Sequence, residues 1–318
     1  MSCGPPPSPP PARPRRHPRV SVSGTIKLSA PETGQFWEIP VLWEDDALLA
    51  LNKPAGLPVS PDRCEPDRPS LMKLLHRGIE RGAPWAKERA LAWLMNAHRL
   101  DAATTGVILL AKTKPALAAL ANQFGAAKPH ILCVALARGS RSEDTFATDA
   151  GLAPQPLQSG VTRVDVKAGK PARTEFAVRE RFPAAGCLLL ECRPFSGRAE
   201  QIRVHLRHLR LPIVGDAIYG GPPLLLSSLK PAYRLKPGQT ERPLISDTAL
   251  HCEQIHIAHP AGGAETKIIA PWPKDLAVAV KYLRCYAQPA TGCGGKNGAP
   301  GGSRTHDQLI KSQLIQIA

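Results

Sequence analysis

Apolar residues follow two different periods along the chain, and these periods predict which segments form strands and which form helices. Residues 41–61 predict two short strands joined by the acidic turn Asp45-Asp46. Residues 107–111 are a continuous apolar run that follows polar turn residues, as is typical of a strand buried in a sheet. Two further strand-like segments are 173–179 and 187–192.

Other segments place apolar residues three or four positions apart, which is the helical period. One such stripe consists of Leu71, Leu74, Leu75 and Ile79, with Ser70 as its N-cap. A second helix begins after Thr113, because threonine caps helices and Pro115 is tolerated in the first turn. Residues 86–95, the segment after Gly197 and residues 275–286 are also predicted to be helical.

Composition divides the chain into a folded part and two tails. An apolar fraction of 43% in 318 residues can build a real core. Residues 1–30 begin with a Pro/Arg-rich tract, and residues 287–318 are rich in Gly and Pro; such segments cannot bury enough surface to fold. We therefore expect one folded domain over residues 31–286 and disordered tails at both ends.

The charge of the chain indicates an anionic partner. The formal net charge is +15 and the sequence pI is about 9.7, a balance that favours nucleic acid, although part of the excess lies in the N-terminal tail. The eight cysteines form no Cys-x-x-Cys pair, which favours free thiols in a reducing cytoplasm. No apolar run approaches the ~20 residues of a membrane span.

The candidate chemistry lies in the segment His98-Arg99-Leu100-Asp101-Ala102-Ala103-Thr104-Thr105-Gly106. These polar turn residues lead into the strand at 107–111, so Asp101 is expected on a loop at a sheet edge, where working residues are common. By itself, an aspartate before Thr and Gly is usually a turn or cap residue. The whole segment, however, resembles the catalytic signature of the RluA-type RNA pseudouridine synthases, with Thr105 at a position where serine is commoner.

Three further blocks resemble the same family, in the same order. Asn52-Lys53-Pro54-Ala55-Gly56-Leu57 is similar to a segment that lines the floor of the active site in this family. Residues 195–206 resemble the Gly-Arg-x-His-Gln-Ile-Arg-Val-His block, and residues 212–220 resemble Pro-Ile-x-Gly-Asp-x-x-Tyr-Gly. The resemblance covers about residues 41–286.

The resemblance assigns roles to particular residues. It implies that Asp101 is the catalytic carboxylate and that Arg203 forms a salt bridge with it. Residues expected to contact the substrate are Lys53, Arg99, Thr105, Arg198 and Gln201. Asp216 is interpreted as a turn or salt-bridge carboxylate. Arg207 and Arg210 follow Arg203 by four and seven positions, and their side chains are either a solvated face or contacts with phosphate.

Two positions depart from the family. Its strand Lys-x-Tyr-x-Ala carries a tyrosine that packs against the target uracil, but all four tyrosines of this chain lie at or beyond Tyr219. One alignment of the strand places Cys133 at the tyrosine position and another places His130 there, so both are candidate substrate contacts. Glu200 replaces a histidine and adds a negative charge near the expected site.

The resemblance implies an α/β (α+β) fold with a central, mainly antiparallel mixed sheet flanked by helices. It implies that a uridine in ribosomal or transfer RNA is cleaved at C1′–N1, its uracil rotated and rejoined through C5, by attack of Asp101 on C1′ or by elimination to a glycal. No cofactor is expected, and no metal either, because alternating histidines of a strand, here His251, His256 and His259, form no metal site without cysteine or acidic partners. We expect a monomer.

Two alternative functions stay open. One is an RNA-binding or assembly factor with impaired catalysis, and the other is a hydrolase that acts on a smaller nucleoside.

Overall fold

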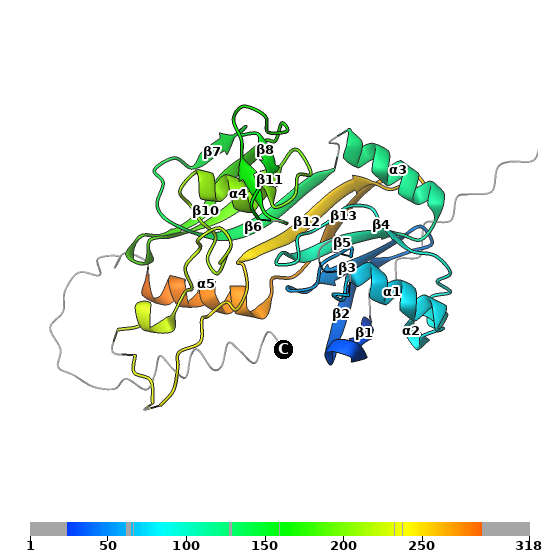
Figure 1. Ribbon diagram of the computed structural model, residues 1–318, viewed down its shortest axis with the longest axis horizontal. Coiled ribbons are helices and arrows are strands. Elements are labelled where there is room, and N and C mark those ends of the chain that lie inside the picture. Colours follow the sequence, from blue (N-terminus) through cyan, green and yellow to red (C-terminus); the bar gives the residue numbers. More distant parts are fainter. Residues whose placement is uncertain are drawn as a thin grey trace, which may run out of the picture. The chain divides into compact units, whose positions relative to one another are not determined.

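A computed structural model describes residues 24–61, 65, 67–126, 129–158, 160–231, 233–236 and 238–287. Its main sheet has eleven strands, in which the only parallel pairing among the described residues joins β5 to β12. This mixed, mainly antiparallel sheet confirms the predicted fold class (Figure 1). The order across the sheet is β1 (Thr25–Ala30), β2 (Gln35–Glu44), β3 (Leu48–Lys53), β5 (Thr105–Ala111), β12 (Leu250–Ala258), β6 (His130–Arg138), β11 (Cys187–Pro194), β10 (Thr174–Phe182) and β7 (Thr145–Thr148).

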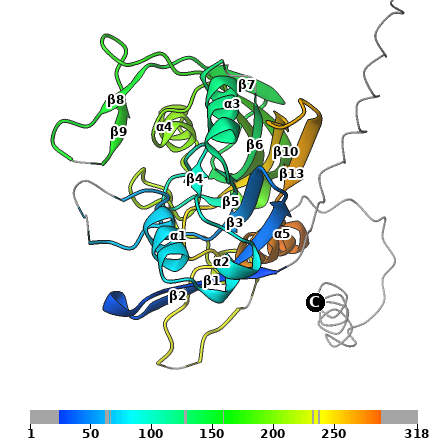
Figure 2. The same cartoon turned by 90° about the vertical axis from the view of Figure 1, so that its right-hand side faces the viewer.

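Short strands and helices complete the structure. Strand β4 (Met95–Asn96) pairs with β5, β13 (Glu265–Ile269) pairs with β12, and β8 (Leu152–Pro154) pairs with β9 (Thr162–Val164) in a separate hairpin. The helices are α1 (Leu71–Glu80), α2 (Pro84–Glu88), α3 (Lys114–Gly125), α4 (Gln201–His208) and α5 (Lys274–Tyr286). Figures 1 and 2 show α1 and α2 near β1 to β3, with α4 on the other part of the sheet beside β8 and β9.

Strand β3 shows why the central strands are apolar without interruption. Leu48 and Ala50 pack into the larger core, whereas Leu49 and Leu51 pack into a second core under α1. Because successive side chains of a strand point to opposite faces, a strand covered on both faces must be apolar at every position. The same two cores receive alternate residues of β5.

The helix caps expected from the sequence are present. The hydroxyl of Ser70 accepts a hydrogen bond from the backbone N–H of Lys73, and that of Thr113 accepts one from Ala116. The helix expected at 86–95 is wrong, since α2 ends at Glu88 and Ala90 has a left-handed φ of 50°. None of the helices in the described part of the chain is both long and apolar enough to cross a membrane.

The N-terminal boundary of the folded part also differs from the expectation. Residues 25–30, assigned to the disordered tail, form β1, whose residues Ile26, Leu28 and Ala30 are buried. Their alternation with Thr25, Lys27 and Ser29 follows the period of a half-buried strand. Apart from residues 24–30 and Ala287, the two predicted tails lie outside the described residues, and their disorder stays a prediction.

Gly106 joins the two halves of the sheet. It is paired with Cys252 where β5 runs parallel to β12, and its φ is 109°. A Cβ atom at this position would collide with the carbonyl oxygen of Cys252. Only glycine combines this backbone conformation with so close an approach of two strands. The loop that carries Asp101 therefore enters the sheet at its centre.

Candidate active site

Asp101 lies in the turn between β4 and β5 and lines a cavity of about 520 Å³. The cavity extends over the start of β6, the end of β11 and the loop that leads into α4. Asp101 is the only carboxylate among the described residues that line it. The turn holds its shape through a hydrogen bond from the backbone N–H of Thr104 to the carbonyl oxygen of Asp101, at 3.1 Å.

The charge on Asp101 is set by two opposing effects. Burial raises the pKa of this carboxyl above its usual value, because a desolvated carboxylate is costly. The nearby positive charge of Arg203, a hydrogen bond from the backbone N–H of Glu200 at 3.2 Å, and the charges of Arg99 and Lys53 act in the opposite direction. Asp101 is thus a half-buried carboxylate whose ionised form depends on surrounding cations.

Arg203 does not form the salt bridge with Asp101 that the sequence predicted. Its guanidinium binds Asp216 through two hydrogen bonds of 2.7 and 2.8 Å. A third nitrogen binds Glu200 at 2.6 Å. All three guanidinium nitrogens thus donate to these two carboxylates, and no ion pair joins Arg203 to Asp101 in the described part of the chain, so Arg203 acts on Asp101 through its charge. Asp216 is the salt-bridge carboxylate that was expected.

Glu200 connects this ion cluster to the β8–β9 hairpin. Its second carboxylate oxygen accepts hydrogen bonds from the Tyr219 hydroxyl at 2.5 Å and from the backbone N–H of Thr162 at 3.0 Å. Its backbone is left-handed, with a φ of 54° at the N-cap of α4. Glu200 therefore shapes the turn whose N–H holds Asp101, a role that the family resemblance did not indicate.

Lys53 occupies a different place from the one expected for a substrate contact. The side chain is fully buried, and its ammonium donates to the carbonyl oxygens of Pro54, Leu57 and Ala102 at 2.8 to 3.0 Å. Burial lowers the pKa of Lys53 to about 7, and the charges of Asp101 and Asp247 oppose this shift. Lys53 thus fixes the residue that follows Asp101, and it does not reach the cavity.

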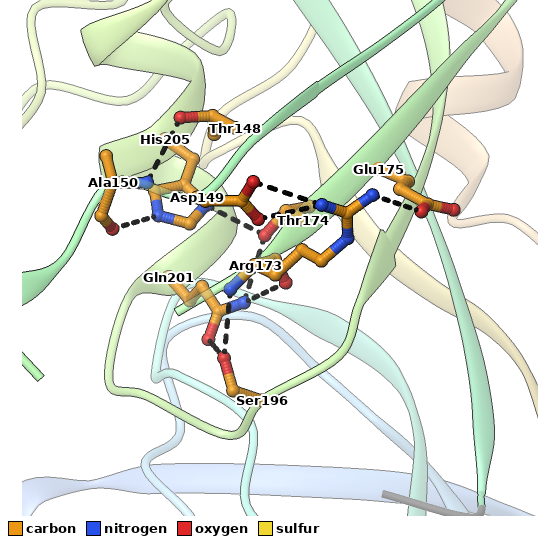
Figure 3. Close-up of polar contacts among 9 residues, drawn as sticks. All are labelled: Thr148, Asp149, Ala150, Arg173, Thr174, Glu175, Ser196, Gln201 and His205. Carbon is orange, nitrogen blue, oxygen red and sulfur yellow. Dashed lines mark hydrogen bonds and ion pairs between the residues drawn. The ribbon is translucent and has the colours of Figure 1, made fainter. Parts of the chain in front are cut away.

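Gln201 lines the cavity, but its polar atoms are already used within the protein. Its amide nitrogen donates to the Arg173 carbonyl and the Thr174 hydroxyl, and its oxygen accepts from Ser196 and the backbone of Arg198. Figure 3 shows Gln201 and His205, both from α4, directed at Thr174. Gln201 therefore builds the loop before α4, and the substrate contact predicted for it is not supported.

Thr105 also has a structural contact in place of the predicted one. Its hydroxyl lies 2.8 Å from Nδ1 of His251 on β12, and Thr105 is not among the cavity residues. The hydroxyl therefore strengthens the parallel contact between β5 and β12. Thr104, its neighbour, lines the cavity instead.

Both candidates for the missing tyrosine line the cavity. Cys133 is buried in its wall, and His130 lies exposed at the start of β6. A hydrogen bond with Cys252 and burial raise the pKa of the Cys133 thiol, so this group stays neutral. Cys133 therefore supplies apolar surface, and the aromatic rings at the cavity are those of Phe124, Phe195 and the histidines.

Positive side chains surround the cavity. Arg99 and Arg198, both predicted substrate contacts, are exposed and line it. Arg193 on β11 and Lys267 on β13 line it as well, and sequence reasoning missed both because no motif includes them. These positive groups can bind the phosphates of a nucleic acid. Asp101 can then react with the part of that nucleic acid that lies inside the cavity.

Comparison with known proteins places this site in a family. Residues 47–208 match the family RNA pseudouridylate synthase. The chain is 36% identical over 260 residues to ribosomal large subunit pseudouridine synthase D of Xylella fastidiosa, covering 77% of this chain and 70% of the relative. It is 34% identical over 287 residues to the protein of that name from Xanthomonas campestris pv. campestris, covering 86% and 79%.

The fold agrees with this assignment. The solved structure of human RNA pseudouridylate synthase domain containing 4 superposes with a TM-score of 0.56 at 20% identity, covering 77% of this chain and 92% of the human one. At that identity the likeness concerns the fold alone. The sequence matches and the signature around Asp101 carry the conclusion that the chain belongs to the RNA pseudouridylate synthase family, in its RluA-type branch.

Proposed function

We propose that this RNA pseudouridine synthase isomerises uridine in the RNA of the large ribosomal subunit, with Asp101 as its catalytic carboxylate. The observation that carries the proposal is the position of Asp101, the only acidic residue in the described part of the chain that lines a cavity bordered by four Arg and Lys side chains. The substrate class follows from the relatives, several of which are named for the large ribosomal subunit.

The reaction breaks the C1′–N1 bond of uridine and joins C1′ to C5 of the same uracil, so it needs no redox partner. The uridine must leave the base stack to enter the cavity. Asp101 acts in its ionised form. Its carboxylate either attacks C1′ as a nucleophile or removes a proton as a base in the elimination to a glycal. In either route C5 loses a proton to water and N1 takes one up, and in the elimination route the proton that Asp101 removed is returned, so the composition of the nucleoside is unchanged.

The cations near Asp101 and the cavity divide into two groups with different tasks. Arg203 and Lys53 are buried and keep Asp101 ionised and in place. Arg99 and Arg198 are exposed, and they are suited to contacts with the phosphates on either side of the flipped uridine. His130 and Phe195 provide rings at the cavity on which the base can stack.

The alternative of an RNA-binding factor without catalysis is not favoured. It rested on the missing tyrosine and on Glu200. In the structure the Glu200 carboxylate is paired with Arg203, and the backbone N–H of Glu200 donates to Asp101. The negative charge of Glu200 is therefore neutralised by Arg203. The proposed cytoplasmic location agrees with five free cysteines among the described residues, and the monomeric state stays a prediction.

The decisive experiment maps pseudouridines in ribosomal and transfer RNA from cells that lack this protein. We expect one or more large-subunit positions to revert to uridine, and the wild-type gene to restore them. The Asp101→Asn variant should not restore them, while its affinity for a transcript of the same region stays within a few-fold of wild type. Restoration by the Asn variant would remove Asp101 from the mechanism.

A further inference from the structure

Four basic residues meet at the C-terminal end of α4 and surround a second hollow. This α4 basic cluster consists of Arg138, Arg207, His208 and Arg210, and the hollow between them measures about 750 Å³. The three residues from the end of α4 and the turn after it are exposed. Arg138, at the end of β6, is half-buried and donates to the Ala185 carbonyl.

The cluster carries charge without compensation. Within the described part of the chain, no ion pair of 4.0 Å or less joins any of its members to a carboxylate. The negative end of the helix dipole favours cations in the last turn, which accounts for Arg207 and His208. It does not account for Arg138, which lies on a strand and adds to the mutual repulsion.

Arg210 adds a second, independent observation. The helix ends in a Schellman motif, in which the N–H of Leu211 bonds to the carbonyl of Leu206 and that of Arg210 bonds to Arg207. The residue at the position of Arg210 in this motif is usually glycine, because its backbone is left-handed; here φ is 61°. An arginine in this conformation lowers stability, which points to a use for its side chain.

The position of the cluster connects it to the catalytic cavity. Helix α4 begins beside Asp101 and ends at the cluster, and its eight residues span about 12 Å. Strand β6 likewise runs from Cys133 at the cavity to Arg138, a path of about 17 Å. A few nucleotides of RNA cover such a distance.

We propose that the α4 basic cluster is a second RNA-binding site, which holds backbone phosphates of the strand that continues from the uridine in the cavity. The inference rests on the proposed function for the identity of the RNA. Arg207 and Arg210 supply guanidinium groups that no carboxylate of the described chain pairs, and such groups bind phosphate in a planar, two-point manner. The contact is to the backbone, so it adds affinity and register but reads no sequence.

The test is the double variant Arg207→Gln/Arg210→Gly, assayed by tritium release from a 5-³H-uridine transcript of large-subunit RNA. We expect Kd and KM to rise about tenfold near 0.15 M salt, with kcat within twofold of wild type. The slope of log K against log salt should fall by about 1.4, or ~0.7 for each lost phosphate contact. Arg210→Gly alone should weaken binding while Tm stays equal or rises, because the left-handed strain is removed.

Two control variants separate this effect from general changes. Ala90→Gly relieves a left-handed backbone of similar φ at an uncharged residue. Arg81→Gln removes an exposed arginine beside α1, the helix that packs on β1. Both should bind the transcript as wild type does. The proposal is overturned if the double variant keeps wild-type affinity and salt slope, or if Arg81→Gln weakens binding equally. Failure of the wild type to release tritium would instead reject the proposed activity, whatever the cluster variants do in binding.

Discussion

At the beginning of α4, Arg203 is buried and binds two carboxylates, whereas at its end Arg207 and Arg210 are exposed and bind none from the described part of the chain. All three residues are arginines, but burial gives Arg203 a different role from that of the two exposed residues. A buried guanidinium must be paired within the protein and so serves to shape the site. An exposed, unpaired one stays available to a polyanion. Regular spacing of arginines therefore does not give them the same surroundings: Arg207 lies one turn after Arg203, and Arg210 lies beyond the end of α4.

The largest expected effect comes from removing the buried member. Arg203→Met leaves Asp216 and Glu200 buried without a counter-charge, which should cost about 3–5 kcal/mol in unfolding free energy. Turnover should fall more than RNA affinity, and Arg203→Lys should restore both in part. The matched variant Arg207→Met should change stability by no more than about 0.5 kcal/mol. Urea unfolding of the three variants measures these free energies. Equal stabilities for Arg203→Met and Arg207→Met would contradict the prediction.

Lys53→Met extends the contrast to a buried lysine. It leaves the carbonyls of Pro54, Leu57 and Ala102 without a donor, at a cost of about 1–3 kcal/mol. The exposed Lys114→Met should have almost no effect.

The effect of Lys53→Met on the free energy of unfolding should also depend on pH, in a direction that follows from the pKa of Lys53. Because the pKa of Lys53 is about 7 in the folded protein, below the ordinary lysine value of 10.5 that applies to the unfolded chain, the unfolded chain binds more protons between these values. The burial penalty is fully present below pH 7 and is relieved as pH rises toward 10.5. The stability of Lys53→Met relative to wild type should therefore fall between pH 7 and pH 9.5; a constant difference would mean that Lys53 does not titrate there.

A smaller effect is expected on the pH dependence of activity, which should respond to cations near Asp101 and not to distant ones. Burial raises the pKa of Asp101, so activity should be lost, as pH falls, at a midpoint above 3.8. Arg99→Gln removes a charge that lowers the pKa of Asp101, and should move the midpoint upward. Arg207→Gln should leave it in place. The measurement is kcat against pH at saturating RNA, and equal midpoints for both variants would remove Arg99 from the environment of Asp101.

The smallest expected effect concerns the missing phenol. Cys133→Tyr places a ring in the cavity wall, and should raise kcat/KM a few-fold in the tritium assay. A stacked base contributes ~1–3 kcal/mol, but the buried site must rearrange to admit the larger side chain. A folded Tyr variant with unchanged or lower activity would show that the cavity functions with the rings it already has.

The sequence predicted the sheet, the Asp101 loop and the order of the motifs, because apolar periods and turn residues are local signals. Partners were harder to predict. Nothing in the sequence around Arg203 reveals that Glu200 and Asp216 bind its guanidinium before Asp101 can. Likewise, the sequence around Lys53 does not reveal that the fold supplies three carbonyl acceptors for its ammonium, those of Pro54, Leu57 and Ala102. Burial of polar groups is decided by tertiary structure.

The parallel contact at Gly106 has a consequence for the synthesis of this protein. Strand β12 inserts between β5 and β6, yet it is made more than a hundred residues after either of them. Until β12 emerges, both neighbours have an unpaired edge that can recruit other strands. The cavity also takes wall residues from both sides of this junction, among them Asp101, Cys133 and Leu250. A nascent chain therefore has no active site until β12 is in place, so modification of RNA begins only after synthesis has passed that strand.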